Sequence, residues 1–232
     1  LIFSWYKNKK KSSIIKKQEN ETAALDFLEK KFDGLKTNNI KILYDMGGIY
    51  KSFEKYDEAI KIYSKLLNLL DNRSKAYADI LYRRGGSFER IGDYETADKD
   101  LLESLKITRE NPYVLNYLAY SWLERNYKIE LSMEMLKEAY DLRKNDPYIT
   151  DSLGWGYYLI NDFENAEKYL KKAVELMPYD PIVNDHYGDI LWMLNRKIQA
   201  RYFWNNVLNL DETDDEMKID VKKKIIYGIE KT

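Results

Sequence analysis

The stretch Asp151-Ser152-Leu153-Gly154-Trp155-Gly156-Tyr157-Tyr158 decides the fold, because its pattern recurs along the chain. Its small residue, Gly154, belongs to a series with gaps of 38, 34, 35 and 34 residues: Gly47, Gly85, Ala119, Gly154 and Gly188. A second series of small residues follows it at similar spacing: Ala59, Ala97, Ser132, Ala166 and Ala200. Two small-residue series with a common period near 34 predict an all-α array of repeated helical pairs.

The residues around the two series suit helices that pack closely. Apolar residues three and four places apart line one face of a helix. Gly or Ala at the eighth place of each repeat lets the two helices of a pair approach, and the aromatic residue at the eleventh place is expected to fill the space beside it. Three helices are predicted to begin at a proline that follows a capping side chain, at Asn111-Pro112, Asp146-Pro147 and Asp180-Pro181.

The period divides the chain of 232 residues into segments. Five repeats are expected over residues 40–212, at about 40–77, 78–111, 112–146, 147–180 and 181–212. The first gap is four residues too long, which we interpret as an extra turn on the second helix of the first repeat, around Lys65 to Ser74. Residues 19–38 lie in register as the second helix of a degenerate repeat. Residues 1–18 form a basic segment, either a fragment of a preceding repeat or of an anchor, and residues 213–232 are predicted to form a capping helix.

Composition excludes several classes of function. The net charge is −1, so there is no overall excess of positive charge that would indicate a nucleic-acid or anionic-membrane surface. The absence of cysteine excludes disulfides, thiolate metal sites and a cysteine nucleophile. The apolar fraction of 44% and the charged fraction of 33% are typical of a folded chain with an ordinary core.

Catalysis is not predicted. His186 is the single histidine, and although it lies between Asp185 and Asp189, no second histidine is available to complete a metal site. Gly47-Gly48 and Gly85-Gly86 fall inside predicted helices rather than in a phosphate-binding loop, and close packing explains the first glycine of each pair. We therefore predict no catalytic residue, no metal and no cofactor, with His186 as a polar helix residue bonded to a neighbour.

This pattern resembles the tetratricopeptide repeat family over residues 40–212. The resemblance implies a right-handed superhelical α-solenoid that binds proteins. The segments Asn111–Trp122, Asp151–Trp155, Val174–Pro178 and Asn184–Asp189 are also similar to the C-terminal part of a proteobacterial, alphaproteobacterial-type tetratricopeptide protein. Its relatives are envelope lipoproteins that act as adaptors of carboxyl-terminal processing proteases. This second resemblance favours a periplasmic or cell-envelope location, and a cytoplasmic one stays open.

In this architecture the first helix of each pair lines a concave wall. Residues at the second, fifth, ninth and twelfth places of the last three first helices form the predicted groove: Tyr113, Asn116, Tyr120, Tyr148, Asp151, Trp155, Tyr158, Asp185, Asp189 and Trp192. The spacing of Asp151, Trp155 and Tyr158 places them on one stripe of a helix, with carboxylates among aromatic rings. The alternative is that these rings pack against the neighbouring repeat.

The predicted function is a non-enzymatic scaffold that binds a peptide or protein partner in this groove. Carboxylates in the groove favour a partner segment with Lys or Arg, and they argue against a nucleic-acid ligand. No membrane contact is expected of the repeats themselves. Two alternatives remain: an envelope adaptor that delivers substrates to a processing protease, and a structural protein that assembles into a homo-oligomer.

Overall fold

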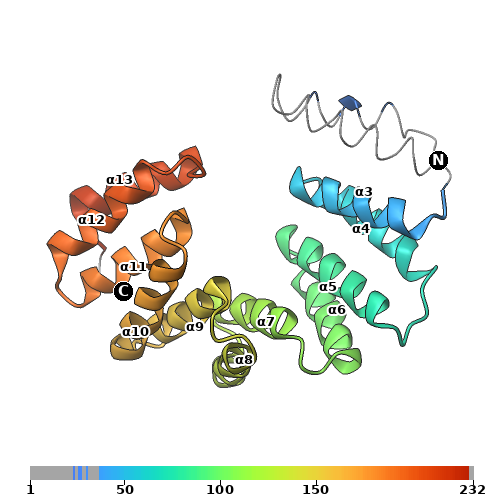
Figure 1. Cartoon of the computed structure of the whole chain (residues 1–232), viewed down its shortest axis with the longest axis horizontal. Helices are drawn as coiled ribbons and strands as arrows, with labels where there is room; N and C mark the ends of the chain where they lie inside the picture. The colour runs from blue at the N-terminus through green and yellow to red at the C-terminus, as the bar shows by residue number, and fades with distance from the viewer. Residues whose placement is uncertain (1–22, 24–25, 28–29, 31–36, 230–232) are drawn as a thin grey trace. The chain divides into compact units, whose positions relative to one another are not determined.

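A computed structural model describes residues 23, 26, 27, 30 and 37–229 of the chain (Figure 1). Within these residues every regular element from residue 37 onward is an α-helix, labelled α3 to α13, so the predicted all-α fold is confirmed. The predicted basic segment 1–18 and most of the predicted helix 19–38 lie outside the described residues. None of the helices in the described part is long and apolar enough to cross a bilayer.

The chain divides into two compact units, residues 1–109 and 110–232, here called the N-terminal and C-terminal units. The described helices of the N-terminal unit are α3 (Ile40–Ser52), α4 (Tyr56–Leu67), α5 (Lys75–Arg90) and α6 (Tyr94–Ile107). Those of the C-terminal unit are α7 (Pro112–Glu124), α8 (Ile129–Leu142), α9 (Pro147–Leu159), α10 (Phe163–Leu176), α11 (Pro181–Met193), α12 (Lys197–Leu208) and α13 (Asp215–Tyr227).

The start of each proline-led helix follows from its sequence. The side chains of Asn111, Asp146 and Asp180 accept hydrogen bonds from backbone N–H groups in the first turns of α7, α9 and α11. Proline stands first in each helix, where its missing N–H has no partner to lose. Each cap stabilises its helix by about 1 kcal/mol, so the sequence fixes where three of the first helices begin.

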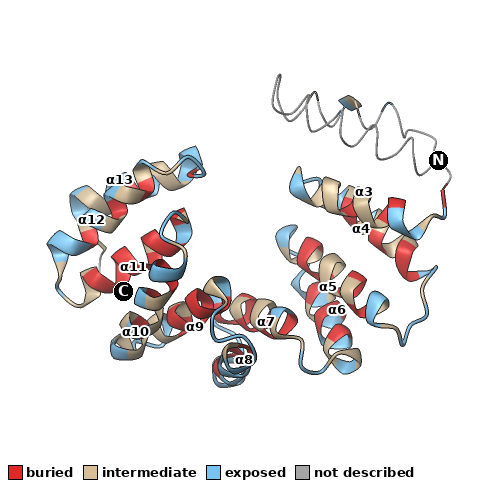
Figure 2. Cartoon of the chain, in the orientation of Figure 1, coloured by how far each residue is buried: buried red, intermediate tan, exposed pale blue. Residues whose placement is uncertain are grey.

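Within a helical pair, the eighth-place glycine packs against a large side chain of the second helix. A Cβ added at Gly154 would lie 2.7 Å from Leu170 Cγ, and one added at Gly188 would lie 2.5 Å from Trp204 Cδ1. The atoms nearest to each added Cβ belong to the second helix, so the second helix occupies the space that the glycine leaves. Buried residues lie on the sides of helices that face their neighbours (Figure 2).

The four extra residues of the first gap do not lengthen the second helix of the first pair, as the sequence had suggested. That helix, α4, ends at Leu67. Helix α5 begins at Lys75, three residues before Ala78, where the second repeat was expected to start. The Ser74 side chain accepts a hydrogen bond of 3.0 Å from the backbone N–H of Tyr77 and so caps α5. The insertion thus gives a turn before α5 and an earlier start to that helix.

The last described helix, α13, stands where the first helix of another pair would begin, 34 residues after α11. Its Val221 is fully buried, and α13 packs on α12. Its eighth place holds Lys222 instead of the glycine or alanine that accepts a second helix in the earlier pairs. The outer side of α13 is therefore not built to receive a second helix at the same close distance.

Candidate binding face on the first helices

The first helices α7, α9 and α11 of the C-terminal unit carry all ten predicted groove residues. Helix α9 packs against both α7 and α11. At the contact of α9 with α11, His186 Nδ1 lies 2.9 Å from Asp151 Oδ2, and both side chains are buried. Burial disfavours the charged imidazole, but the charge and hydrogen bond of Asp151, together with the charges of Asp189 and Asp185, outweigh it, so the pKa of His186 is raised.

Trp155 lies at the centre of this face. Its indole stacks on His186, with ring centroids 4.0 Å apart and planes 13° from parallel. It also stacks on Tyr158, at 4.5 Å and 10°. The indole Nε1–H donates a hydrogen bond of 2.6 Å to Glu124 Oε1 on α7. One half-buried aromatic side chain therefore contacts groups from all three first helices and is held in a single orientation.

A second cluster joins α11 to the capping helix α13. Lys224 Nζ lies 2.7 Å from Asp185 Oδ2 and 2.8 Å from Asp189 Oδ2. Trp204 Nε1–H donates a hydrogen bond of 2.9 Å to Asp189 Oδ1. Two of the predicted groove carboxylates thus share one lysine of the same chain.

Burial governs the ionisation of this second cluster. Burial and the neighbouring Asp185 raise the pKa of Asp189 to about 6, against the opposing effect of Lys224. Burial, followed by the charges of Asp189 and Asp185, raises the pKa of Tyr158 to about 12. Burial works against the charge of Lys224, but attraction to the two carboxylates is stronger, and the pKa of Lys224 is raised.

Trp192 has a different environment from Trp155. Its Nε1–H donates a hydrogen bond of 3.0 Å to the carbonyl oxygen of Ile229, just after α13. A Cβ added at Gly228 would lie 2.5 Å from ring atoms of Trp192, and Gly228 has a φ of +78°, so this close contact requires glycine. The Trp192 side chain therefore holds the end of α13.

The remaining four predicted residues lie on α7 and α9. Tyr113 and Tyr148 are exposed, at 45% and 61% of their surface. Asn116 and Tyr120 are half-buried. The structure therefore brings Asp151, Trp155 and Tyr158 together around His186, and Asp185 with Asp189 around Lys224, and it places the two exposed tyrosines at the starts of α7 and α9.

Sequence reasoning missed two contributors to this face, Glu124 and Lys224. It predicted that His186 is bonded to a neighbour but did not identify Asp151 as that neighbour. A signal for Lys224 was available, because the 34-residue register places α13 directly after α11 in the series of first helices. Within the described residues, no group of three His, Asp or Glu side chains could hold a metal ion. The arrangement offers stacking surface, one exposed carboxylate at Glu124 and no evident nucleophile.

The His186–Asp151 pair predicts an unusual dependence of stability on pH. The folded pKa of His186 is raised above 6.5, so the folded state binds this proton more tightly than the unfolded state. The resulting stability is fully present below pH 6.5 and is lost as pH rises through the folded pKa. We expect urea denaturation to show a free energy of unfolding that falls above pH 6.5, and the difference between the wild type and His186→Gln to shrink over the same range. A constant difference would contradict the pairing.

Comparisons with known proteins were made with both sequence and structure. A profile described as "Tetratricopeptide repeat" matches residues 40–69, 78–111 and 152–180. The TPR repeat-containing protein PA4667 of Pseudomonas aeruginosa is 30% identical over 120 residues, which is 52% of this chain and 18% of that protein. The match thus spans less than one fifth of the length of this relative.

Solved structures share the fold at low sequence identity. The thermophilic TPR protein TTC0263 of Thermus thermophilus is 16% identical, with a TM-score of 0.69 over 81% of this chain and 99% of its own. A tetratricopeptide repeat protein of Parabacteroides merdae is also 16% identical, with a TM-score of 0.67 over 96% of this chain and 85% of its own. PilF of Pseudomonas aeruginosa is 19% identical, with a TM-score of 0.64 over 82% and 85%.

Proposed function

We propose that this chain, which a tetratricopeptide repeat profile matches over residues 40–69, 78–111 and 152–180, is a non-enzymatic scaffold that holds a protein partner on the first helices of its C-terminal unit. Repeats of this kind generally mediate contacts between proteins. The observation that supports this site is the stack of His186, Trp155 and Tyr158, tied to α7 by the hydrogen bond from Trp155 to Glu124.

The stack favours binding because its central ring is already ordered. Aromatic side chains offer a large contact area, and tryptophan and tyrosine are common among the residues that contribute most to protein interfaces. Trp155 stacks on His186 and on Tyr158 and is bonded at its N–H, so a partner that packs against its accessible part immobilises little further side-chain freedom. The exposed Tyr113 and Tyr148 on α7 and α9 add contact area of the same kind.

Charge on this face supports a partner segment with Lys or Arg. The carboxylates of Asp151, Asp185 and Asp189 outnumber the cations His186 and Lys224, which leaves an excess of one negative charge when all five groups are ionised. Glu124, on α7, is a further carboxylate and is exposed. Such an excess acts mainly on selectivity and on the rate of association, rather than on affinity alone.

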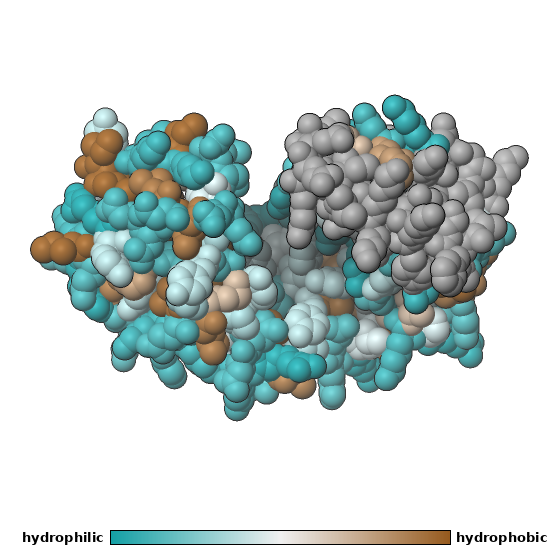
Figure 3. Space-filling view, turned by 45° about the horizontal axis from the view of Figure 1, so that its top comes forward, coloured by the Kyte–Doolittle hydropathy of each residue, from teal (hydrophilic) through white to brown (hydrophobic). Residues whose placement is uncertain are grey.

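Self-association is a second candidate, because the last two helices expose several large apolar side chains. Ile198 and Tyr202 of α12 are 87% and 62% exposed, and Ile226 and Tyr227 of α13 are 65% and 80% exposed. On the visible face of the molecule, apolar side chains form separate patches in a mostly hydrophilic surface (Figure 3). Light scattering over a range of concentrations distinguishes a strict monomer from a self-associating chain. The adaptor role inferred from the resemblance stays a prediction.

The scaffold proposal predicts that Trp155→Ala loses partners that the wild type retains. Removal of the indole takes away the centre of the stack, and we expect at least a tenfold fall in the yield of proteins cross-linked to the chain and identified by mass spectrometry. Tyr179→Ala, which removes a ring that is 80% exposed in the turn between α10 and α11, is the matched control and should retain them. Equal recovery with both variants would place the binding site elsewhere. Trp192 is unsuitable for this test, because it also bonds the chain at the end of α13, so its loss would change packing as well as binding.

A further inference from the structure

Helix α13 has one side that is packed on the C-terminal unit and one side that is exposed. Its inner side carries the fully buried Val221 and also Lys224, which contacts two carboxylates of α11. The carbonyl oxygen of Ile225 accepts a hydrogen bond of 2.9 Å from Arg201 Nε–H on α12. Because the inner side is held by packing, an ion pair and a hydrogen bond, the outer side is presented in a fixed orientation.

The outer side of α13 combines an apolar centre with charged flanks. Ile219 and Ile226, seven residues apart, are 55% and 65% exposed. Residues seven apart lie on nearly the same line of a helix, so the two isoleucines form one stripe. Exposed charged residues flank this stripe in two pairs, each with an acid seven residues before a lysine: Glu216 and Lys223 on one flank, Asp215 and Lys222 on the other.

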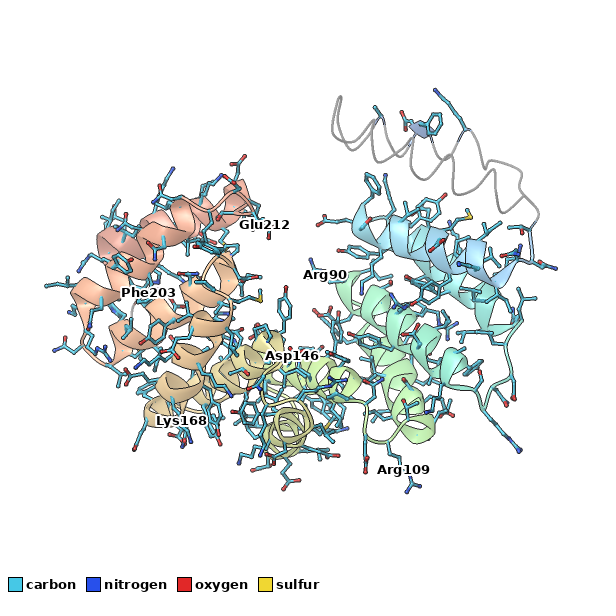
Figure 4. All side chains as sticks on the ribbon, in the orientation of Figure 1. Arg90, Arg109, Asp146, Lys168, Phe203 and Glu212 are labelled. Carbon is cyan, nitrogen blue, oxygen red and sulfur yellow. The ribbon has the colours of Figure 1, made fainter. Side chains whose placement is uncertain are left out.

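Contacts within the chain use this charge only weakly. Lys223 Nζ lies 2.8 Å from Asp220 Oδ1, but the two side chains are 64% and 60% exposed, so this surface pair contributes little to stability. Lys218 Nζ lies 3.9 Å from Asp215 Oδ1, whose side chain is fully exposed. Glu212, in the turn just before α13, adds a carboxylate to the acidic end (Figure 4). The acids and lysines of the outer side are thus accessible to a partner.

The order of these charges fits a second copy of the same helix in the antiparallel direction. With Ile219 of both copies on a two-fold axis, the acids of one copy lie opposite the lysines of the other on both flanks. A parallel pair would set acid against acid. An antiparallel pair centred between Ile219 and Ile226 would bring Lys222 and Lys223 of both copies together. Charge therefore selects the register that is centred on Ile219, because like charges at close range repel.

The contact area of such a pair is limited. Each copy contributes one helix of 13 residues, and a lysine at its eighth place prevents the close approach that Gly154 and Gly188 allow in their own pairs. Stable dimers generally bury more surface than one pair of short helices provides. We expect a weak association that depends on protein concentration and on salt, because screening weakens exposed ion pairs.

We infer that α13 is a dimerisation helix, through which two copies of this chain associate in an antiparallel pair centred on Ile219. Ile226 of each copy then lies beside the turn that precedes α13 in the other copy. The inference gives the self-association considered above a defined surface and a defined partner. It does not rest on the face around Trp155, which belongs to the first helices α7, α9 and α11.

Analytical ultracentrifugation of the full chain at low salt, from about 1 μM to about 1 mM, tests the association. We expect a monomer–dimer equilibrium that Ile219→Asp weakens at least tenfold, because a carboxylate then replaces the apolar contact on the axis. Ile198→Asp, which changes an 87% exposed isoleucine of α12, is the matched control and should associate as the wild type does. A strict monomer at every concentration, or equal weakening by the two variants, would overturn the inference.

Charge reversal supplies a second readout that a loss of folding cannot imitate. Lys222→Glu combined with Lys223→Glu makes both flanks acidic, and Asp215→Lys combined with Glu216→Lys makes both flanks basic. Each double variant should be monomeric by itself, because like charges meet across the axis. An equimolar mixture of the two should form a heterodimer at least as tight as the wild-type dimer. A mixture that stays monomeric would contradict the proposed pairing.

Cross-linking tests the register, because the chain has no cysteine of its own. Under oxidation Ile219→Cys should give a disulfide-linked dimer, since the two copies of this residue meet on the axis. Ile226→Cys should not, because its two copies are separated by about 21 Å along the helices, at about 1.5 Å per residue. Efficient linkage through position 226, or none through position 219, would show that the register is wrong. Ile219→Asp should still retain the partners that depend on Trp155, so the failure of either proposal is seen separately.

Discussion

Trp204→Ala is expected to lower the free energy of unfolding of the C-terminal unit by about 3–5 kcal/mol, the typical cost of removing a buried tryptophan. Trp204 is fully buried on α12. Its ring fills the space left by Gly188, lies 5.4 Å from the Trp192 ring, and donates its N–H to Asp189. The substitution therefore creates a cavity and also leaves a buried carboxylate with one hydrogen bond fewer.

Urea denaturation followed by circular dichroism measures this effect, with Tyr202→Ala as the control. Tyr202 lies two residues earlier on the same helix and is 62% exposed, so its loss should change the free energy of unfolding by no more than about 0.5 kcal/mol. A Trp204→Ala protein within 1 kcal/mol of the wild type, on the order expected of surface changes, would mean that α11 and α12 do not pack through Gly188.

Lys224→Met is expected to destabilise the C-terminal unit by about 3 kcal/mol, because removal of one partner leaves buried charge uncompensated. Asp189 is buried and Asp185 is mostly so, and Lys224 is the cation that contacts both. Hydrogen exchange should show the backbone amides of α13 exchanging faster in the variant. Without its counter-ion, Asp189 should also take up a proton more readily, so its pKa should rise further above about 6.

Two variants separate the loss of charge from the loss of packing at Lys224. The double variant Lys224→Met with Asp189→Asn removes one buried charge and keeps an oxygen for the Trp204 N–H, so part of the stability should return. Lys223→Met removes an exposed lysine that pairs with Asp220 on the surface, and it should have little effect. If Lys223→Met and Lys224→Met behaved alike, the contact of α13 with α11 would not depend on this ion pair.

The helical array could be predicted from the sequence because its signals are local. Small residues at a fixed period, and Asn or Asp followed by proline at helix starts, act within one pair of helices. The predicted extra turn at the end of α4 is wrong. Helical periodicity around Lys65 continues past Leu67, but α4 ends there, and the Ser74 cap determines where α5 starts. Capping chemistry determined this boundary more strongly than apolar spacing did.

The electrostatic partners on the first helices could not be predicted in the same way. From the sequence, Asp151, Asp185 and Asp189 are expected on one face of their helices, but the groups that face them cannot be identified. Those partners, His186 and Lys224, come from neighbouring first helices, 35 residues further along the chain in both cases. Which side chains meet across such a contact depends on the relative shift of two helices, which periodicity alone does not determine.

The local character of the packing has a consequence for how this chain folds. Among the described helices, substantial contacts join only those that are adjacent in the chain or one helix apart within the C-terminal unit. The contact order is therefore low, and loop-closure entropy opposes folding only weakly, which is typical of fast-folding helical proteins. Cooperativity is correspondingly limited, so a stopped-flow experiment should detect the C-terminal unit unfolding in Trp204→Ala while the helices of the N-terminal unit persist.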